Sequence, residues 1–252
     1  MKTAKKQAKR RKVARKRKAA GPPAGLAERA QRVVRAMEQL YPDANCALQH
    51  AGALQLLVAT MLSAQSTDKM VNSITPALFA RYPDARAFAR ARREDLEAAV
   101  HSTGFFRQKS KNLQLACAKI MAEHGGAVPD TMEALTSLPG VARKTANVVL
   151  GTFFGKPEGI VVDTHVGRLA QRLELVWTSR DPKDAVKIEA DLMQLLPREK
   201  WTFFSHALIL HGRQVCTSQR PRCSACDLAP DCPSAFTFGA VRLARPPRAR
   251  HA

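Results

Sequence analysis

The clearest local signal in this chain is LTSLPGVARKTAN, at residues 135–147. A short helix is predicted to end at Ser137, because Leu138, Pro139 and Gly140 form a turn that reverses the chain, and a second helix follows directly. In such a helix-hairpin-helix, backbone N–H groups at the turn and the new helix N-terminus lack partners, so they can hold a DNA phosphate without recognising base sequence. An ordinary helical hairpin with a glycine cap has the same turn, so both interpretations stay open here.

Two charged residues, one in this hairpin and one shortly after it, are candidate catalytic residues. Lys144 lies in the second helix, beside the expected phosphate, where it is either a further phosphate contact or a nucleophile. The neighbouring Arg143 and the helix N-terminal dipole are expected to favour the neutral, nucleophilic amine. Asp163 is predicted to cap the helix that begins at Thr164, which would fix a carboxylate at the end of a rigid element. Capping alone would also explain this aspartate.

Four of the six cysteines form a compact set near the C-terminus. Cys216, Cys223, Cys226 and Cys232 have the spacing C-x6-C-x2-C-x5-C, followed directly by Pro233. Four thiolates this close in sequence can converge on one zinc ion or on an iron-sulfur cluster. Structural zinc sites usually pair two C-x2–4-C knuckles, and only one such knuckle is present here.

The charge of the chain predicts a polyanionic partner. The formal net charge is +20, and eleven Lys and Arg with no acid lie in residues 1–18, which leaves +9 for the remainder. Nucleic acid is the first candidate for such a partner. Residues 1–25 are predicted to be a disordered basic tail, either a solvated extension or a DNA-gripping arm, and residues 237–252 a flexible C-terminal tail.

Apolar residues recur at helical spacing along most of the chain. The first amphipathic helix is predicted over residues 26–40, and only residues 159–162 are a brief extended candidate, so the fold class is all-α. No run of 18 apolar residues appears, which predicts no membrane span. The basic start lacks the apolar stretch of a secretory signal, so an intracellular protein is expected, in which the cysteines are not expected to pair as disulfides. Further helices are predicted at residues 54–62, 71–79, 96–100, 113–121, 132–135, 141–153, 166–173, 185–195 and 201–210.

Three motifs together resemble one protein family. LPGVARKTANVVLG at residues 138–151, VVDTHVGRLAQRL at 161–173 and the four-cysteine loop are similar to the endonuclease III branch of the helix-hairpin-helix DNA glycosylases. The resemblance runs from about residue 26 to residue 235. It implies a two-lobed all-α fold, with a helical barrel lobe that contains the hairpin and an iron-sulfur cluster lobe. The expected boundaries are 46–156 for the barrel lobe, and 26–45 with 157–236 for the cluster lobe.

The resemblance assigns roles to individual residues. Lys144 matches the lysine that attacks C1′ of the damaged nucleotide, expels the base and forms a Schiff base that cleaves the strand by β-elimination. Asp163 matches the aspartate that assists deprotonation of this lysine and stabilises the positive sugar transition state. A base inside a duplex must be flipped out to be reached. Gln65 resembles the residue that fills the gap, and Phe105 or Phe106 is expected to wedge the opposite strand.

The resemblance also favours a 4Fe-4S cluster over zinc at the four cysteines. Many hairpins of this family have a second glycine where this chain has Ala142, at a position expected to be helical. Further DNA contacts are expected at Leu138, Pro139, Gly140, Val141, Ala142, Thr145 and His165.

The predicted function is a bifunctional DNA glycosylase and AP lyase that removes damaged, oxidised pyrimidines from double-stranded DNA. The protein is expected to be monomeric and cytoplasmic, and nucleoid-associated in a bacterial host. The adenine-excising branch lacks the lysine and carries an additional C-terminal domain, whereas Lys144 is present and only about twenty residues follow Cys232. A non-catalytic DNA clamp would have no need of Lys144 or Asp163. The sequence leaves the preferred lesion open.

Overall fold

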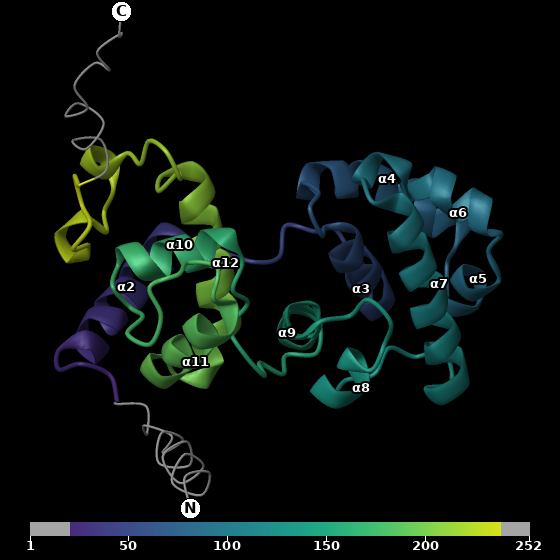
Figure 1. Cartoon of the computed structure of the whole chain (residues 1–252), viewed down its shortest axis with the longest axis horizontal. Coiled ribbons are helices and arrows are strands. Elements are labelled where there is room, and N and C mark those ends of the chain that lie inside the picture. The colour runs from purple at the N-terminus through teal and green to yellow at the C-terminus, as the bar shows by residue number, and fades with distance from the viewer. Residues whose placement is uncertain (1–20, 238–252) are drawn as a thin grey trace, which may run out of the picture.

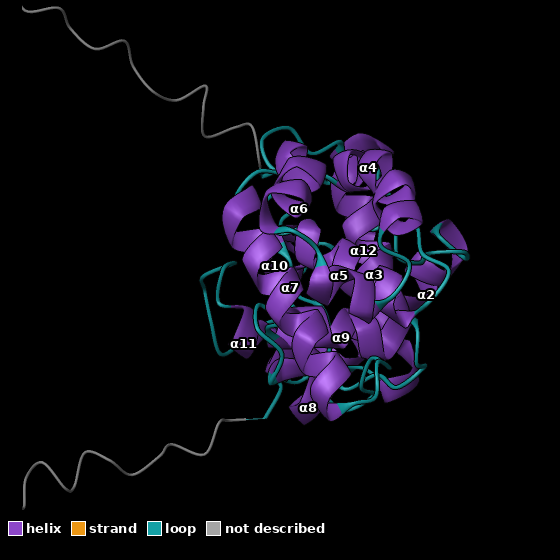
Figure 2. Ribbon diagram, turned by 90° about the vertical axis from the view of Figure 1, so that its right-hand side faces the viewer, coloured by secondary structure: helices purple, strands orange, loops and turns teal. Residues whose placement is uncertain are grey.

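A computed structural model describes residues 21–237, and its helices form two lobes (Figure 1). The described residues contain no strand, so the all-α prediction is confirmed (Figure 2). The predicted tails lie outside the described residues at positions 1–20 and 238–252. Within the described part of the chain, no helix is long and apolar enough to cross a membrane.

The barrel lobe holds the contiguous middle of the chain and contains the hairpin. It consists of α3 (Ala53–Leu62), α4 (Asp68–Arg81), α5 (Ala85–Arg90), α6 (Arg93–Val100), η1 (His101–Thr103), α7 (Phe106–Glu123), α8 (Met132–Thr136) and α9 (Arg143–Thr152). Its buried side chains form one apolar cluster, with Phe88 fully enclosed.

The second lobe, called the cluster lobe here, combines both ends of the described chain. It consists of α2 (Leu26–Leu40), α10 (Thr164–Arg172), α11 (Ala185–Leu195), η2 (Arg198–Lys200), α12 (Trp201–Gln214), η3 (Cys223–Ala225) and η4 (Ala229–Asp231). A separate apolar cluster around Phe204 forms its core. Helix α2 packs against α11, α12 and η4. Arg32 Nε of α2 lies 2.6 Å from Asp231 Oδ1 of η4, so α2 holds η4 in place.

Two segments connect the lobes, one between α2 and α3 and one between α9 and α10 (Figure 1). In the second segment the side chains alternate between the two cores. Ile160 and Val162 belong to the apolar cluster of the cluster lobe, whereas Val161 belongs to that of the barrel lobe. Because successive side chains of an extended chain point to opposite sides, this short segment contributes to both cores at once. It leads directly to Asp163, at the start of α10.

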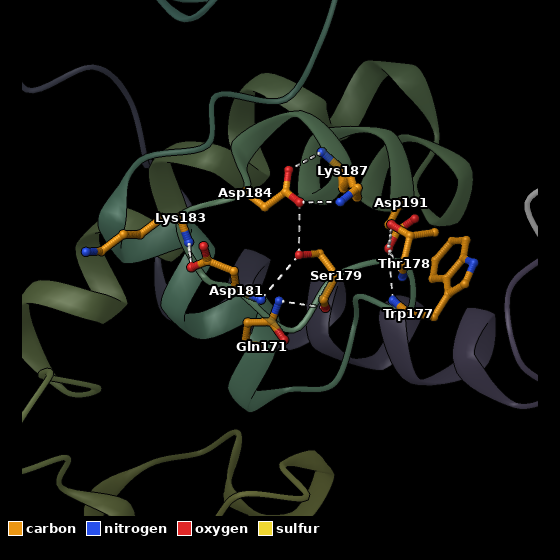
Figure 3. Close-up of polar contacts among 9 residues, drawn as sticks. All are labelled: Gln171, Trp177, Thr178, Ser179, Asp181, Lys183, Asp184, Lys187 and Asp191. Carbon is orange, nitrogen blue, oxygen red and sulfur yellow. Dashed lines mark hydrogen bonds and ion pairs between the residues drawn. The ribbon is translucent and has the colours of Figure 1, made fainter.

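Helix α11 is positioned by the loop that precedes it (Figure 3). Asp191 is fully buried, and its Oδ2 accepts hydrogen bonds from the backbone N–H groups of Trp177 at 2.8 Å and Thr178 at 2.9 Å. Asp184 caps the N-terminus of α11. Glu189 of α11 then reaches the barrel lobe, because its carboxylate accepts from Arg143 Nε of α9 at 3.1 Å. The second hairpin helix is thereby fixed against the cluster lobe.

Candidate active site

The hairpin turn is anchored by its apolar side chains. Leu138 and Val141 are buried in the core of the barrel lobe, whereas Gly140 and Ala142 are exposed. Val141 N donates to Leu138 O at 3.1 Å, and Gly140 has a φ of 79°, a conformation that favours glycine. The side chains of Leu138 and Val141 therefore lie in the core, and Gly140 and Ala142 form the exposed part of the turn.

The helix after the turn begins later than the sequence predicted. Ala142 is not helical but is the N-cap of α9, with φ −89° and ψ 167°, and no side chain caps this helix end. The extended conformation keeps φ negative, so an alanine fits without strain where related hairpins have a second glycine. Lys144 is the second residue of α9 and is exposed.

The predicted catalytic and gap-filling residues line one pocket between the lobes. Lys144 and Thr145 from the start of α9, Asp163 from the start of α10, and Gln65 from the loop after α3 all line it. Its volume is about 210 Å³. The remaining lining residues include His206 and Arg213 of α12.

Asp163 has the expected place at the N-terminus of α10. Its Oδ1 accepts hydrogen bonds from the backbone N–H groups of His165 and Val166, each at 2.8 Å. Both bonds use the same oxygen, so capping does not occupy Oδ2. The carboxylate is therefore held rigidly at the pocket wall while half of it stays available for chemistry.

Arg143 does not take the place that the sequence indicated. Its guanidinium pairs with Glu189 and donates to Glu158 O at 3.3 Å, and it is not among the residues that line the pocket. The cation expected beside Lys144 is thus neutralised by a carboxylate of α11. The cationic side chain that does share the pocket with Lys144 is Arg213.

The two residues expected to probe the duplex share an unusual backbone conformation. Gln65 has a φ of 55° and Phe105 a φ of 48°, a region that non-glycine residues rarely adopt and that is concentrated at functional sites. Phe105 is 66% exposed, whereas Phe106 packs against the core of the barrel lobe and its ring lies 4.5 Å from that of His101. Between the two phenylalanines, the geometry favours Phe105 as the wedge.

His165 lies away from the pocket. Its Nδ1 is 3.1 Å from Arg168 Nη2, and its ring packs so closely on Gly212 that a Cβ atom there would meet it at 3.0 Å. Burial lowers the pKa of this histidine. The structure therefore gives His165 a place in the contact between α10 and α12, and its predicted DNA contact stays a prediction.

Sequence reasoning missed the contribution of α12. His206 is buried within the lining of the pocket, and burial lowers its pKa to about 4. Arg213 of α12 donates to Asp68 Oδ2 of α4 at 2.8 Å and so links the lobes. His206, Leu210 and Arg213 recur at four and three residues, and this helical spacing of two ionisable residues is the signal that could have placed them on one face.

The four predicted metal ligands line one small apolar pocket of about 20 Å³ in the cluster lobe. Arg172 is buried beside it, and its Nη1 donates to Cys216 Sγ at 3.1 Å. His211 Nε2 lies 3.4 Å from Cys226 Sγ, and Tyr41 Oη lies 3.1 Å from the other ring nitrogen. Among residues 21–237, no group of three or more His, Cys, Asp or Glu side chains is arranged to hold a metal ion. The cysteines therefore share a cavity without forming a closed mononuclear site.

The remaining two cysteines differ from each other. Cys117 is buried in the barrel core, and burial raises its pKa to about 12, as expected of an inert core thiol. Cys46 is only partly buried and lines the pocket that contains Lys144.

Comparison with known proteins decides the family. The model of the HhH-GPD superfamily of base excision DNA repair proteins matches residues 58–198. Endonuclease III of Synechocystis is 53% identical over 208 residues, which cover 82% of this chain and 93% of that protein. The chain belongs to the endonuclease III family. Endonuclease III of Bacillus subtilis is 42% identical, over 77% of this chain and 86% of that protein.

Solved structures of the endonuclease III family have the same architecture. A trapped endonuclease III–DNA covalent intermediate has a TM-score of 0.78 at 36% identity, covering 84% of this chain and 97% of that one. A non-covalent endonuclease III–DNA complex has the same score and identity, with coverage of 87% and 99%. The predicted two-lobed helix-hairpin-helix fold is confirmed, as is the predicted enzyme class, a DNA glycosylase with AP lyase activity in base excision repair.

Proposed function

We propose that this DNA glycosylase and AP lyase removes oxidised pyrimidines from double-stranded DNA with Lys144 as its nucleophile and Asp163 as its essential carboxylate. The observation that carries the proposal is that both residues line one pocket, at the first turns of two helices from different parts of the chain. An amine and a fixed carboxylate that line one pocket supply what glycosidic bond cleavage with covalent capture requires.

The chemical steps follow from these two groups. Lys144 Nζ attacks C1′ of the extruded nucleotide, and the bond from C1′ to the base breaks, so that the base leaves with the electron pair. Asp163 accepts a proton released from Nζ and stabilises the positive charge that develops on the sugar. Opening of the sugar ring gives a Schiff base between Nζ and C1′. Loss of a C2′ proton then breaks the bond from C3′ to its phosphate oxygen, which nicks the strand.

DNA binding is assigned to the exposed backbone of the hairpin and to two side chains. The unpaired N–H groups at the N-terminus of α9 suit a phosphate next to the lesion, which would place the extruded sugar near Lys144. We assign gap filling to Gln65 and wedging of the opposite strand to Phe105. Two related endonuclease III structures contain DNA, which supports this partner. We further propose that the protein acts as a monomer in the cytoplasm, with the lobe boundaries given above.

The endonuclease III family implies an iron-sulfur cluster, and the residues of this chain suit one. Four thiols around a single apolar cavity, with a buried guanidinium donating to one of them, match the environment of an anionic thiolate-bound cluster. We propose that Cys216, Cys223, Cys226 and Cys232 hold a 4Fe-4S cluster. When bound, the cluster crosslinks the loop after α12 and thereby holds its shape.

Borohydride trapping tests the function directly. Reduction of the Schiff base by borohydride should join the protein covalently to a duplex that contains an abasic site. A panel of duplexes with oxidised pyrimidines and pyrimidine dimers, scored separately for base release and for nicking, would then define the substrate. Absence of a covalent complex with the abasic duplex would refute the nucleophile assignment.

A further inference from the structure

Lys109 of α7 is buried although it is a lysine. Only 7% of its surface is exposed, and burial lowers its pKa. Its Nζ donates to the backbone oxygen of Leu62 and to that of Thr103, both at 2.7 Å. Ordering and burying a long cationic side chain costs free energy, and a methionine or leucine could fill similar space more cheaply. The position therefore indicates a use for the ammonium group.

The two acceptors are the last residues of two helices. Leu62 ends α3 and Thr103 ends η1, so one ammonium group caps both C-termini. Carbonyl groups at a helix C-terminus lack partners within the helix, and a cation there also interacts favourably with the helix dipole. The bonds join segments that are about forty residues apart in the sequence.

Both helix ends lead directly to the residues expected to probe the duplex. Gln65 follows Leu62 by three residues, and Phe105 follows Thr103 by two. Each of the two residues has a positive φ, and Lys109 N also donates to Phe105 O at 3.0 Å. Lys109 thus contacts the Phe105 segment with its backbone and its side chain, and the Gln65 segment with its side chain.

We infer that Lys109 is a positioning residue that fixes Gln65 and Phe105 relative to each other, so that filling the gap and wedging the opposite strand occur together. The inference rests on the proposed function, because it takes the DNA roles of these two residues from there. It assigns Lys109 no contact with DNA, since Nζ is buried between two backbone carbonyls. Its effect should appear when a base must leave a paired helix and be absent when no base pair has to open.

The experiment compares Lys109→Met with Lys111→Met in the full chain. Lys111 is exposed two residues further along α7, so it controls for loss of one positive charge on the same helix. Two reactions are measured: release of an oxidised pyrimidine from a duplex, and nicking of an abasic site in a single-stranded oligonucleotide. Fluorescence of 2-aminopurine opposite the lesion reports whether the duplex is opened.

Lys109→Met should slow base release from the duplex by about tenfold or more, because misplacement by about 1 Å can cost that much. Nicking of the single strand should stay close to that of the Lys111→Met control, and the rise in 2-aminopurine fluorescence should be lost. Lys109→Arg, which keeps two donors, should recover part of the duplex activity. Equal losses on both substrates, or a Lys109→Met variant that matches the control on the duplex, would overturn the inference.

A second measurement needs no change at Lys109, and therefore holds even if that variant fails to fold. Gln65→Ala and Phe105→Ala are combined in the wild-type background. If the two residues act as one unit, the double variant should slow base release by much less than the product of the single effects. Effects that multiply would overturn the inference, whereas a wild-type protein that neither releases bases nor nicks abasic sites would instead overturn the proposed function.

Discussion

Asn112 of α7 occupies the space that a side chain on Gly140 would need. A Cβ atom on Gly140 would lie 2.6 Å from Asn112 Nδ2 and 2.7 Å from Asn112 Cβ. Asn112 is further held by Gln108, whose Nε2 donates to its Oδ1 at 2.8 Å. The hairpin turn is thus packed against the same helix that carries Lys109.

Gly140→Ala should weaken DNA binding because the turn must move away from Asn112. The left-handed conformation alone costs about 1–2 kcal/mol for a non-glycine residue. Gly155 is the matched control, since it has a φ of 63° but nothing within 4 Å of its missing Cβ. Binding of an abasic duplex, measured by fluorescence anisotropy, should fall only for Gly140→Ala. Equal affinities of the two variants would contradict a phosphate-binding hairpin.

Lys144→Gln should abolish strand cleavage and leave DNA binding largely intact. The amide cannot form a Schiff base, so nicking is expected to fall by about a thousandfold or more. The measurement is borohydride trapping together with an anisotropy titration. Lys156 is a suitable control position, because it lies outside the pocket and is paired with Asp130. Residual trapping by Lys144→Gln would mean that another amine is the nucleophile.

Asp163→Asn separates the two tasks of this residue. Asparagine caps a helix about as well as aspartate, so thermal stability should change little. Base release should nevertheless slow by about a hundredfold or more, because the carboxylate charge is lost. Asp163→Ala should lose the same activity and in addition about 1 kcal/mol of stability from the missing cap. An active Asp163→Asn enzyme would reduce Asp163 to a structural cap.

His206 should make the protein less stable in acid. Burial lowers its pKa from the usual 6.5 to about 4, while Asp163 and Asp68 act to raise it and Arg213 to lower it. The unfolded chain therefore binds the proton first as pH falls below 6.5, and about 3 kcal/mol of stability is lost by pH 4. The melting temperature should fall over this range, and less steeply in His206→Gln. Parallel curves for the two proteins would show that another group governs the transition.

Cys226→Ser should lower the iron content and destabilise the loop after α12. Cys117→Ser is the control, because Cys117 lies in the barrel lobe, away from the proposed cluster. Metal analysis and visible absorbance of the purified proteins distinguish iron from zinc. Zinc in place of iron, or full iron content in Cys226→Ser, would contradict the assignment of the four cysteines to a 4Fe-4S cluster.

Local signals in the sequence predicted most of the elements. Helix α2 ends at Leu40 as its periodicity indicates, and the turn before α9 was placed by Leu138, Pro139 and Gly140. Helix α5 was missed, because its six residues span less than two turns and show no periodicity. The start of α9 was placed two residues too early, since Val141 is apolar and buried but belongs to the turn.

The sequence predicted only part of the site, because the residues that line the pocket come from distant segments of the chain. Lys144 and Asp163 could be named from their motifs. The pairing of Arg143 with Glu189, and the presence of His206 in the pocket, depend on how α11 and α12 pack against α9. The pairing of Arg143 with Glu189 joins residues 46 positions apart and leaves no local pattern, so the sequence placed Arg143 beside Lys144, whereas the structure turns it toward α11.

The packing of α2 against α12 and η4 has a consequence for synthesis on the ribosome. All residues of the barrel core emerge in one uninterrupted stretch and can associate before translation ends. Helix α2 emerges first of the described helices, yet Arg32 can meet Asp231 only after synthesis has passed residue 231. The apolar face of α2, with Val33 and Met37, therefore stays exposed to solvent during elongation. This face is the surface that a chaperone would need to cover.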